Sequence, residues 1–438
     1  MDKITLFTGK QDSAMEYHWV PNTFSLLASR VDLDKTEVVV IDERIEKENT
    51  IKLLEKHVPS SIFLGISSST GFHLGRAIET AEYVKSRFPQ IPIVWGGAHV
   101  TALIEESLKE DFVDVVVAGR GDDHFPRLIE GMKNKNLNGI PGVYWDKDGS
   151  MTGLPNEVFS DMNLTPAWPY QILKIEDYIN PKTKAINMTT SWGCPNLCTF
   201  CYWYKNNNPW SGFSPERVFS EARNFVEEYG IQKFYFLEAD YFGDVGRALN
   251  IARLIKDLNI SYITNARVSD VGLLSKEDFK LLEESGCSLI NIGLESASPK
   301  MLKLMNKRIN LDDVLVGVEN ARSTNILLFF TLLFQMPGED IDDVKVTYQY
   351  VEKLRELNPN IRIQNHFFCP LPNLPMTRLA TKKGYSPPDN MKGWVKETQW
   401  IDGFEMRPWM AEQFKRGYGK LFEELFPSDD STTEAYNK

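Results

Sequence analysis

Three of the five cysteines lie close together, in the segment WGCPNLCTFCYW. Cys194, Cys198 and Cys201 follow a C-x3-C-x2-C spacing, and one loop can turn three such thiolates toward one cluster face. Thiolates are soft ligands that suit an iron–sulfur cluster or zinc. A structural zinc site needs a fourth protein ligand, and no histidine occurs between His124 and His366. The spacing therefore favours a [4Fe–4S] cluster with one open iron over zinc or three incidental cysteines.

The cysteine spacing resembles the signature of the radical S-adenosylmethionine (SAM) superfamily. The resemblance implies a [4Fe–4S] cluster on these cysteines, with SAM bound to the open iron through its amino and carboxylate groups. In this family the reduced cluster cleaves SAM to methionine and a 5′-deoxyadenosyl radical, on a partial (β/α)6 barrel. An external electron donor of the flavodoxin or ferredoxin type is implied with it.

Other residues resemble the SAM-contacting positions of the same family. Phe200 matches a hydrophobic position near the adenine. Glu238 and Asp240, in FLEADYF, match the acidic end of the second barrel strand, which meets the SAM amino group. Arg267, in NARVSD, matches a basic position near the SAM carboxylate. These residue types suit their partners, because carboxylates bind ammonium groups and arginine binds carboxylates.

A further match lies in IGLESAS, where Glu295 and Ser296 resemble a stretch near the SAM ribose. MPGED, residues 336–340, matches the proline-glycine turn after the fifth barrel strand. Taken alone, Arg267 and Glu295 could equally form a buried ion pair. In this order behind the cysteines, the residues together favour a SAM site.

The segments that carry these residues read as alternating strands and helices. A barrel with six βα units is less than the complete (β/α)8 form, so we predict a partial (β/α)6 barrel over residues 186–385. The six predicted strands are INMTTS, KFYFLEAD, SYITNARV, LINIGLES, ILLFFTLLF and IRIQNHFF.

The first 140 residues predict a separate α/β domain with a doubly wound parallel sheet. Five short runs rich in β-branched residues alternate with helical patterns, which is typical of such sheets. The runs are ITLFTG, EVVVID, IFLGISSS, IPIVWGG and VDVVVAG. Residues 141–185 are predicted to be a linker with a hairpin around Asp148 and Gly149. Residues 386–438 are predicted to be a helical cap with an acidic tail.

A sheet domain in front of such a barrel resembles the cobalamin-binding, or class B, radical SAM enzymes. The segments PNTFSLLASRV, VVVIDER, WGGAHVT and VVAGRGDDHF fit that layout. The resemblance implies cobalamin beyond the strand ends, with its nucleotide tail in the sheet domain. The implied contacts are Ser67, Ser68, Ser69, Thr70, Gly96, Gly97, His99, Thr101, Gly119 and Gly121.

The chain departs from two cobalamin patterns. The histidine-ligand signature D-x-H-x-x-G is absent, since the nearest string, at Asp122, lacks the glycine. Where the family often has G-E-G-E, this chain has Arg120 in the second position. His99 is therefore predicted to pack near the corrin rather than to bind cobalt. A first domain that no longer holds cobalamin is the alternative.

The resemblance implies a C-methyltransferase that acts on an unactivated carbon of a small-molecule precursor, such as a natural product or lipid. The alternative enzyme is a radical SAM cyclase, dehydratase, ring-contracting enzyme or epimerase. A cobalamin-binding sensor or carrier is the remote third hypothesis. Tyr202, Trp203 and Cys369 are predicted on the substrate side, and the motifs identify no catalytic residue.

The composition excludes several other classes. The chain has 438 residues, with 49 Lys and Arg against 60 Asp and Glu, a net charge of −11. Nucleic-acid binders usually carry a basic excess, so no nucleic-acid partner is predicted. The longest apolar run, Ile326 to Phe334, is too short to span a membrane. The N-terminus lacks the pattern of a signal peptide, so we predict a cytoplasmic protein.

Overall fold

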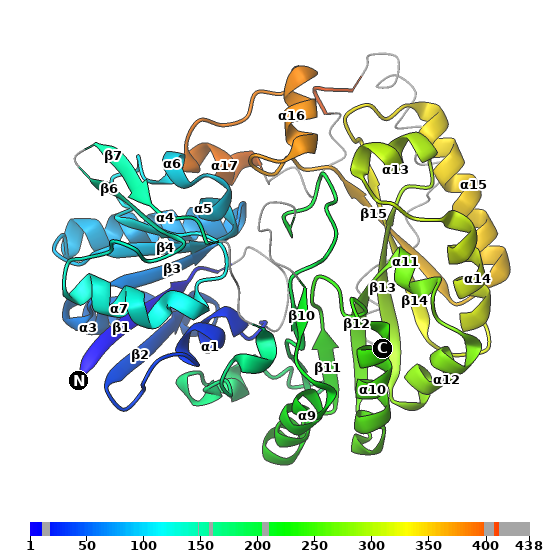
Figure 1. Ribbon diagram of the computed structural model, residues 1–438, viewed down its shortest axis with the longest axis horizontal. Helices are drawn as coiled ribbons and strands as arrows, with labels where there is room; N and C mark the ends of the chain where they lie inside the picture. The colour runs from blue at the N-terminus through cyan, green and yellow to red at the C-terminus, as the bar shows by residue number, and fades with distance from the viewer. Residues whose placement is uncertain (11–17, 148, 157–160, 204–209, 398–406, 411–438) are drawn as a thin grey trace.

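Two large sheets form the framework of the structure, which is a computed structural model. It describes residues 1–10, 18–147, 149–156, 161–203, 210–397 and 407–410. Figure 1 shows the N-terminal sheet and its helices in blue and cyan, beside the second sheet and its helices in green and yellow.

The first sheet begins with five parallel strands in the order β2-β1-β3-β4-β5. This order confirms the predicted doubly wound sheet. Such strands are buried on both faces and therefore consist of continuous apolar runs. The strands are β1 (Asp2–Thr8), β2 (Thr36–Asp42), β3 (Leu64–Ser68), β4 (Ile93–Gly97) and β5 (Val115–Val117).

Helices cover both faces of this sheet. Phe24 of α1 and Leu128 of α7 pack with Ile4 on one face. Leu54 of α3 and Leu74 of α4 pack with Phe7 on the other face. The helices are α1 (Asn22–Ala28), α2 (Glu43–Glu46), α3 (Thr50–His57), α4 (Phe72–Arg87), α5 (Ala98–Ala102), α6 (Ile104–Ser107) and α7 (Phe125–Lys133).

Part of the predicted linker extends the first sheet. Strands β6 (Val143–Lys147) and β7 (Ser150–Gly153) form an antiparallel hairpin, and β6 pairs with the edge of β5. The predicted hairpin is thus present, although Asp148 of its turn lies outside the described residues.

The second sheet has six parallel strands in the order β15-β14-β13-β12-β11-β8. All six predicted barrel strands are present, and β8 does not pair with β15, which confirms the partial barrel. The strands are β8 (Ala185–Asn187), β11 (Lys233–Phe236), β12 (Ser261–Arg267), β13 (Cys287–Glu295), β14 (Leu327–Phe334) and β15 (Ile361–Phe367).

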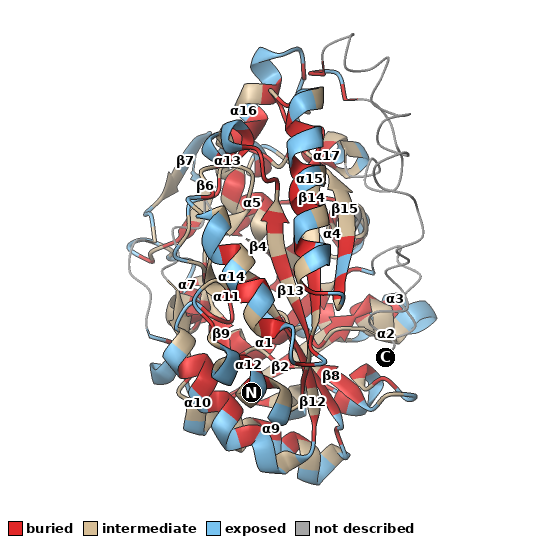
Figure 2. Ribbon diagram, turned by 90° about the vertical axis from the view of Figure 1, so that its right-hand side faces the viewer, coloured by how far each residue is buried: buried red, intermediate tan, exposed pale blue. Residues whose placement is uncertain are grey.

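Helices pack on the outside of this sheet. Figure 2 shows β13 mostly buried, whereas α14 and α15 carry both buried and exposed residues along their length. The helices are α9 (Pro215–Tyr229), α10 (Val245–Ile255), α11 (Val268–Val271), α12 (Lys276–Glu284), α13 (Pro299–Met305), α14 (Leu311–Ala321) and α15 (Ile341–Leu357).

A segment from the N-terminal part fills the base of the barrel. Trp19 packs edge-on against Tyr235 with 5.0 Å between the ring centroids, next to a buried cluster that includes Ile263. The Val20 backbone N–H donates to Asn187 Oδ1 at 2.6 Å, and Asn187 Nδ2 donates to the Val20 carbonyl at 3.2 Å. These contacts fix the second sheet against the first.

The C-terminal region connects the two parts again. Met376 of α16 (Pro375–Lys382) lies in the barrel core, whereas Trp394 of α17 (Met391–Glu397) lies in the core of the first sheet. Lys392 Nζ lies 2.6 Å from Glu82 Oε1 of α4. The predicted acidic tail lies outside the described residues. No helix in the described part of the chain meets the length and hydropathy needed to cross a bilayer.

We expect Trp394→Ala to lower the free energy of unfolding by about 3–5 kcal/mol, because it removes a buried indole and leaves a cavity. Trp394 is 3% exposed. Val316→Ala is the control, because Val316 is 54% exposed and its loss should cost less than about 0.5 kcal/mol. Denaturant titration of both variants measures this, and equal losses would contradict the docking of α17.

Candidate functional site

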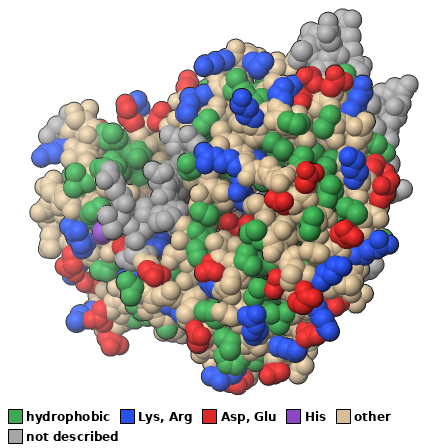
Figure 3. All heavy atoms as spheres, turned by 45° about the vertical axis from the view of Figure 1, so that its right-hand side comes forward, with side chains coloured by type: hydrophobic (Ala, Val, Ile, Leu, Met, Phe, Trp, Pro, Cys, Tyr) green, Lys and Arg blue, Asp and Glu red, His purple; other side chains and the backbone are tan. Residues whose placement is uncertain are grey.

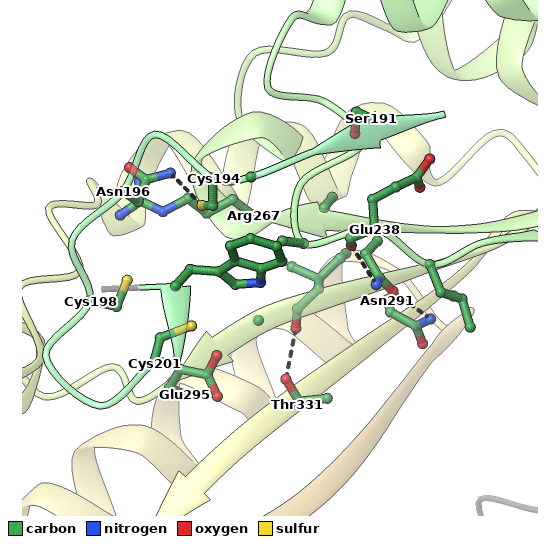
Figure 4. Close-up of a pocket in the computed structure, with 18 of the residues that line it drawn as sticks. Ser191, Cys194, Asn196, Cys198, Cys201, Glu238, Arg267, Asn291, Glu295 and Thr331 are labelled. Atoms are coloured by element: carbon green, nitrogen blue, oxygen red, sulfur yellow. Dashed lines mark hydrogen bonds between the residues drawn. The ribbon is translucent and has the colours of Figure 1, made fainter. Parts of the chain in front are cut away.

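One cavity lies at the carboxyl ends of the second sheet and has a volume of about 520 Å³. Figure 4 shows the three cysteines toward one end of this cavity, with Glu238 and Asn291 toward the other. In parallel sheets ligands bind beyond the carboxyl ends of the strands. The cavity therefore has the position expected of a cofactor site.

The cysteine loop follows β9 (Ser191–Trp192), which pairs with β10 (Ser211–Gly212). Its backbone is held by α13: the Thr199 N–H donates to the Met305 carbonyl at 3.0 Å. The Thr199 hydroxyl donates to the Leu304 carbonyl at 2.8 Å. These bonds fix the loop while all three cysteine side chains line the cavity.

The three thiols are free cysteines in this structure. Burial raises the pKa of the Cys194 thiol and that of Cys201, the latter to about 11. In the described part of the chain, no three His, Cys, Asp or Glu side chains converge as the ligands of a single metal ion. A four-iron cluster does not require such convergence, because each thiolate binds a different iron.

Glu238 lines the cavity just after β11. Its Oε1 accepts the Thr190 N–H at 2.5 Å, and burial raises the pKa of its carboxyl group. Within the described residues its Oε2 is buried without a hydrogen bond. This oxygen is the type of acceptor that an ammonium group would satisfy.

Asp240 does not line the cavity, although the motif places it in the SAM site. It is 2% exposed, and it lies next to the Asp270 carboxyl group of α11. Burial raises the pKa of both groups, and Asp270 raises that of Asp240 further. Within the described residues, Asp240 Oδ1 is buried without a hydrogen bond.

Arg267 lies at the end of β12 and lines the cavity. Its N–H donates to Asp270 Oδ2 at 2.9 Å, which caps α11. Its guanidinium donates to the Lys307 carbonyl, and its Nε is buried without a hydrogen bond in the described structure. The guanidinium thus retains a donor that no described protein atom satisfies.

Glu295 and Lys307 form an ion pair in the cavity wall. Glu295 has φ +66°, at an irregularity in the pairing of β13 with β14. Its Oε1 lies 3.3 Å from Lys307 Nζ, which also donates to the Gly293 carbonyl at 2.7 Å. Sequence analysis missed Lys307, because no motif marks it. A lysine that is 4% exposed is informative only once the fold is known.

Phe200 lines the cavity, whereas Ser296 does not. The Ser296 hydroxyl lies 3.0 Å from the Thr347 hydroxyl and accepts the Ser298 N–H at 3.1 Å. Ser296 therefore supports the start of α13 from behind the wall. β13 ends at Glu295, whose φ of +66° turns the chain at this point.

Two amides on neighbouring strands also line the cavity and were missed by sequence analysis. Asn291 Nδ2 donates to Asn265 Oδ1 at 3.0 Å, and Asn265 Nδ2 donates to the Glu238 carbonyl at 2.8 Å. Polar residues within otherwise apolar buried strands are the signal that could have found them.

The second cavity, of about 390 Å³, lies at the carboxyl ends of the first sheet. It is lined by six of the predicted cobalamin contacts: Ser67, Ser68, Ser69, Gly97, Gly119 and Gly121. Several of these residues, together with Gly96, also line a narrow apolar slot between the sheet, α1 and α7. A Cβ on Gly96 would have only the Val117 carbonyl within 4 Å, at 3.9 Å.

Three other predicted contacts lie outside this cavity. His99 is fully buried on α5, where its Nδ1 lies 3.1 Å from the Thr70 hydroxyl. Burial lowers the pKa of His99 to about 4, and its ring packs edge-on against Trp394. Thr101 donates to the Gly97 carbonyl at 2.7 Å and accepts the Gly119 N–H at 3.0 Å. Thr101 thus holds two cavity-lining loops from behind.

Trp192 and Trp203 line both cavities, so they form a shared wall. Their rings pack edge-on with 6.0 Å between centroids, and Tyr202 lines the second cavity. Cys369 lines neither cavity, and its Sγ lies 3.7 Å from the Glu397 carbonyl. Two of the three predicted substrate-side residues therefore lie at the boundary between the cavities.

Two family models match the chain: the radical SAM superfamily over residues 188–351 and the B12 binding domain over residues 14–129. An uncharacterized methyltransferase of Pyrococcus horikoshii is 28% identical over 343 residues, covering 76% of this chain and 73% of that protein. The anaerobic magnesium-protoporphyrin IX monomethyl ester cyclase of Rubrivivax gelatinosus is 26% identical, covering 65% of this chain and 53% of that one.

The fold also matches a solved structure. The radical SAM methyltransferase TsrM of Kitasatospora setae, with cobalamin and a [4Fe–4S] cluster bound, superposes with a TM-score of 0.74. The alignment is 16% identical and covers 98% of this chain and 90% of that one. The likeness extends over both sheets, so it includes their arrangement.

We expect Asp240→Asn to change the pH dependence of stability. Burial keeps the Asp240 and Asp270 pair more protonated in the folded chain than in the unfolded chain. The stability due to the wild-type pair is therefore present at low pH and is lost as pH rises above the ordinary Asp range of about 4. Between about pH 5 and pH 9, the free energy of unfolding of the wild-type apoprotein should therefore fall relative to that of the variant. A constant difference over this range would contradict the assignment.

Proposed function

We propose a function from the premise that this chain belongs to the radical SAM superfamily and carries a B12 binding domain. The proposed function is that of a cobalamin-dependent C-methyltransferase. Its substrate would be a small-molecule precursor, methylated at an unactivated carbon. The observation that carries the proposal is the wall formed by Trp192 and Trp203, which both cavities share. Two cofactors bound in these cavities would face one substrate position.

The first cavity suits the cluster and SAM. Cys194, Cys198 and Cys201 would hold the cluster, since they supply soft ligands on one restrained loop. The unsatisfied oxygen of Glu238 suits the amino group of SAM, and the unsatisfied N–H of Arg267 suits its carboxylate. We leave Asp240 and Ser296 out of this set, because they do not line the cavity.

The second cavity suits cobalamin. Gly97 has φ +100°, and a Cβ there would lie 2.2 Å from the Ser68 carbonyl oxygen. A side chain at this position would therefore displace the backbone of Ser68, which also lines the cavity. The apolar slot beneath, lined by Leu6, Val94 and Gly96, would take the nucleotide tail.

When bound, the cluster with SAM supplies hydrogen-atom abstraction, and cobalamin supplies methyl transfer. The chain's own residues contribute orientation and exclusion of water. The Glu295–Lys307 pair neutralises charge in the wall, and the indoles of Trp192 and Trp203 present apolar surface where the cavities meet. Reactive carbon species need such a dry, ordered environment.

The likeness to a magnesium-protoporphyrin ester cyclase supports the alternative of a radical reaction without methyl transfer. The two functions differ in their products. Methyl transfer yields both S-adenosylhomocysteine and 5′-deoxyadenosine, together with a methylated product. A cyclase or dehydratase yields 5′-deoxyadenosine without stoichiometric S-adenosylhomocysteine.

We expect the anaerobically purified protein, reconstituted with iron, sulfide and hydroxocobalamin and then desalted, to retain about four irons and about one cobalt per chain. Cys194→Ala, Cys198→Ala and Cys201→Ala should each lose the iron and all SAM cleavage. Cys287→Ala, at the start of β13 and outside the cavity, is the matched control and should retain both. Normal iron content in any of the first three variants would overturn the cluster assignment.

Gly96→Leu should reduce retained cobalt by about tenfold or more, because the new side chain would fill the apolar slot. Its iron content should not change. Gly246→Leu, on the exposed side of α10, introduces the same side chain away from both cavities and should retain cobalt. Equal cobalt in the two variants would show that the slot does not hold the cofactor.

A further inference from the structure

The residues around the cysteine loop carry a charge opposite to that of the whole chain. The net charge of the chain is −11. Residues 296–311 nevertheless contain four Lys or Arg residues and no Asp or Glu, and residues 370–388 contain three and none. Two stretches without a carboxylate are notable in so acidic a protein.

Both stretches contact the cysteine loop directly. Asn306 Nδ2, at the end of α13, donates to the Leu197 carbonyl at 2.7 Å. The Met376 N–H, at the start of α16, donates to the Thr199 carbonyl at 3.1 Å. The loop therefore lies between two basic segments that are far apart in the sequence.

Five of these basic residues are exposed and form what we call the basic collar: Lys303, Arg308, Arg378, Lys382 and Lys383. None of them forms a salt bridge with a carboxylate in the described part of the chain. The other two basic residues are already paired, Lys300 with Asp340 and Asp343, and Lys307 with Glu295.

Apolar surface accompanies the collar. Leu197, between the first two cysteines, is 46% exposed, and the adjacent Pro195 is also exposed. Figure 3 shows several Lys and Arg side chains at the top of the molecule, with a group of Asp and Glu side chains beside them. A small apolar centre with a charged rim is typical of transient protein interfaces.

We propose that the basic collar is the docking surface for an acidic one-electron carrier protein. This inference rests on the proposed function, since the cluster must gain an electron before SAM is cleaved. In the step, the carrier is oxidised by one electron and the cluster is reduced by one, and no bond or proton is transferred. The two segments that carry the collar each contact the cysteine loop, so docking there brings the carrier to the cluster.

Charge complementarity selects the partner. A carrier with a negative surface would be attracted to the collar and repelled by most of the remaining surface of the acidic chain. Such steering raises association rates by about 10-fold to 1,000-fold and weakens with salt. Because the chain has a net charge of −11, a local positive patch gives an acidic carrier one preferred docking orientation. A uniformly charged surface would not do so.

The test uses the reconstituted holoenzyme and reduced flavodoxin as the probe. Lys303→Glu combined with Lys382→Glu should weaken flavodoxin binding, measured by calorimetry, by about tenfold or more. The second-order rate of cluster reduction, measured by stopped-flow absorbance, should fall to a similar extent. SAM cleavage driven by dithionite, a small reductant, should stay within about twofold of the wild type.

Two further variants make the test specific. Lys303→Gln combined with Lys382→Gln removes the charge without reversing it, and should weaken binding less than the glutamate pair does. Lys52→Glu combined with Lys56→Glu, on the exposed side of α3 in the first part of the chain, is the matched charge-reversal control. This control should leave flavodoxin binding within about twofold.

Several outcomes would overturn the docking surface. These are equal weakening in the α3 control, binding by the wild type that does not change with salt, and binding of RNA but not flavodoxin by the collar. Failure of the proposed function looks different, because SAM cleavage by the wild-type holoenzyme would then be absent with dithionite as well. If the glutamate variant shows normal dithionite-driven SAM cleavage and unchanged flavodoxin binding, the docking surface is rejected and the proposed function is not.

Discussion

A parallel sheet brings the carboxyl ends of all its strands to one edge, and both cavities depend on this constraint. Each sheet of this chain is parallel over the strands that line a cavity. Loops that are far apart in the sequence therefore converge, and hydrogen bonds such as those of Thr101 and Thr199 then hold them in place. The two sheet edges that carry the cavities also face each other across Trp192 and Trp203.

The facing of the two edges requires the sheets to be held in a fixed relation. Trp19 and Val20 attach the N-terminal part to the base of the barrel, and α17 returns the chain to the first sheet after the barrel is complete. Trp394 of α17 is buried and Trp19 is partly buried, and burial of an aromatic side chain of this size is worth a few kcal/mol. Val20 and Leu26 also belong to the buried cluster of the barrel, and Val40 of β2 packs against it, so a shared core supports the wall between the cavities.

The sequence predicted the strands well, because buried parallel strands are short, apolar and β-branched, and this pattern is local. It also identified the cysteines and the residues Glu238 and Arg267 at the cavity, through their spacing and order. Motifs specify position along the chain but not side-chain direction. Asp240 and Ser296 match the motif, yet neither side chain lines the cavity, and the Ser296 hydroxyl lies against that of Thr347. His99 likewise lies in the pattern WGGAHVT but packs against α17, some three hundred residues away in the chain.

The residues that sequence analysis missed share a physical reason. Lys307, Asn265 and Asn291 matter only through partners on other elements: Lys307 through Glu295, and the two amides through each other. The amides continue to the Glu238 backbone, so they join β11, β12 and β13 beneath the charged residues of the cavity. Every ionisable residue among the lining residues other than the cysteines belongs to the Glu238, Arg267, Glu295 and Lys307 group. The amide pair is neutral and lies at the same end of the cavity as Glu238. The formal charges in the wall balance, with Glu238 and Glu295 against Arg267 and Lys307, so no lining charge is left without a counterpart of opposite sign.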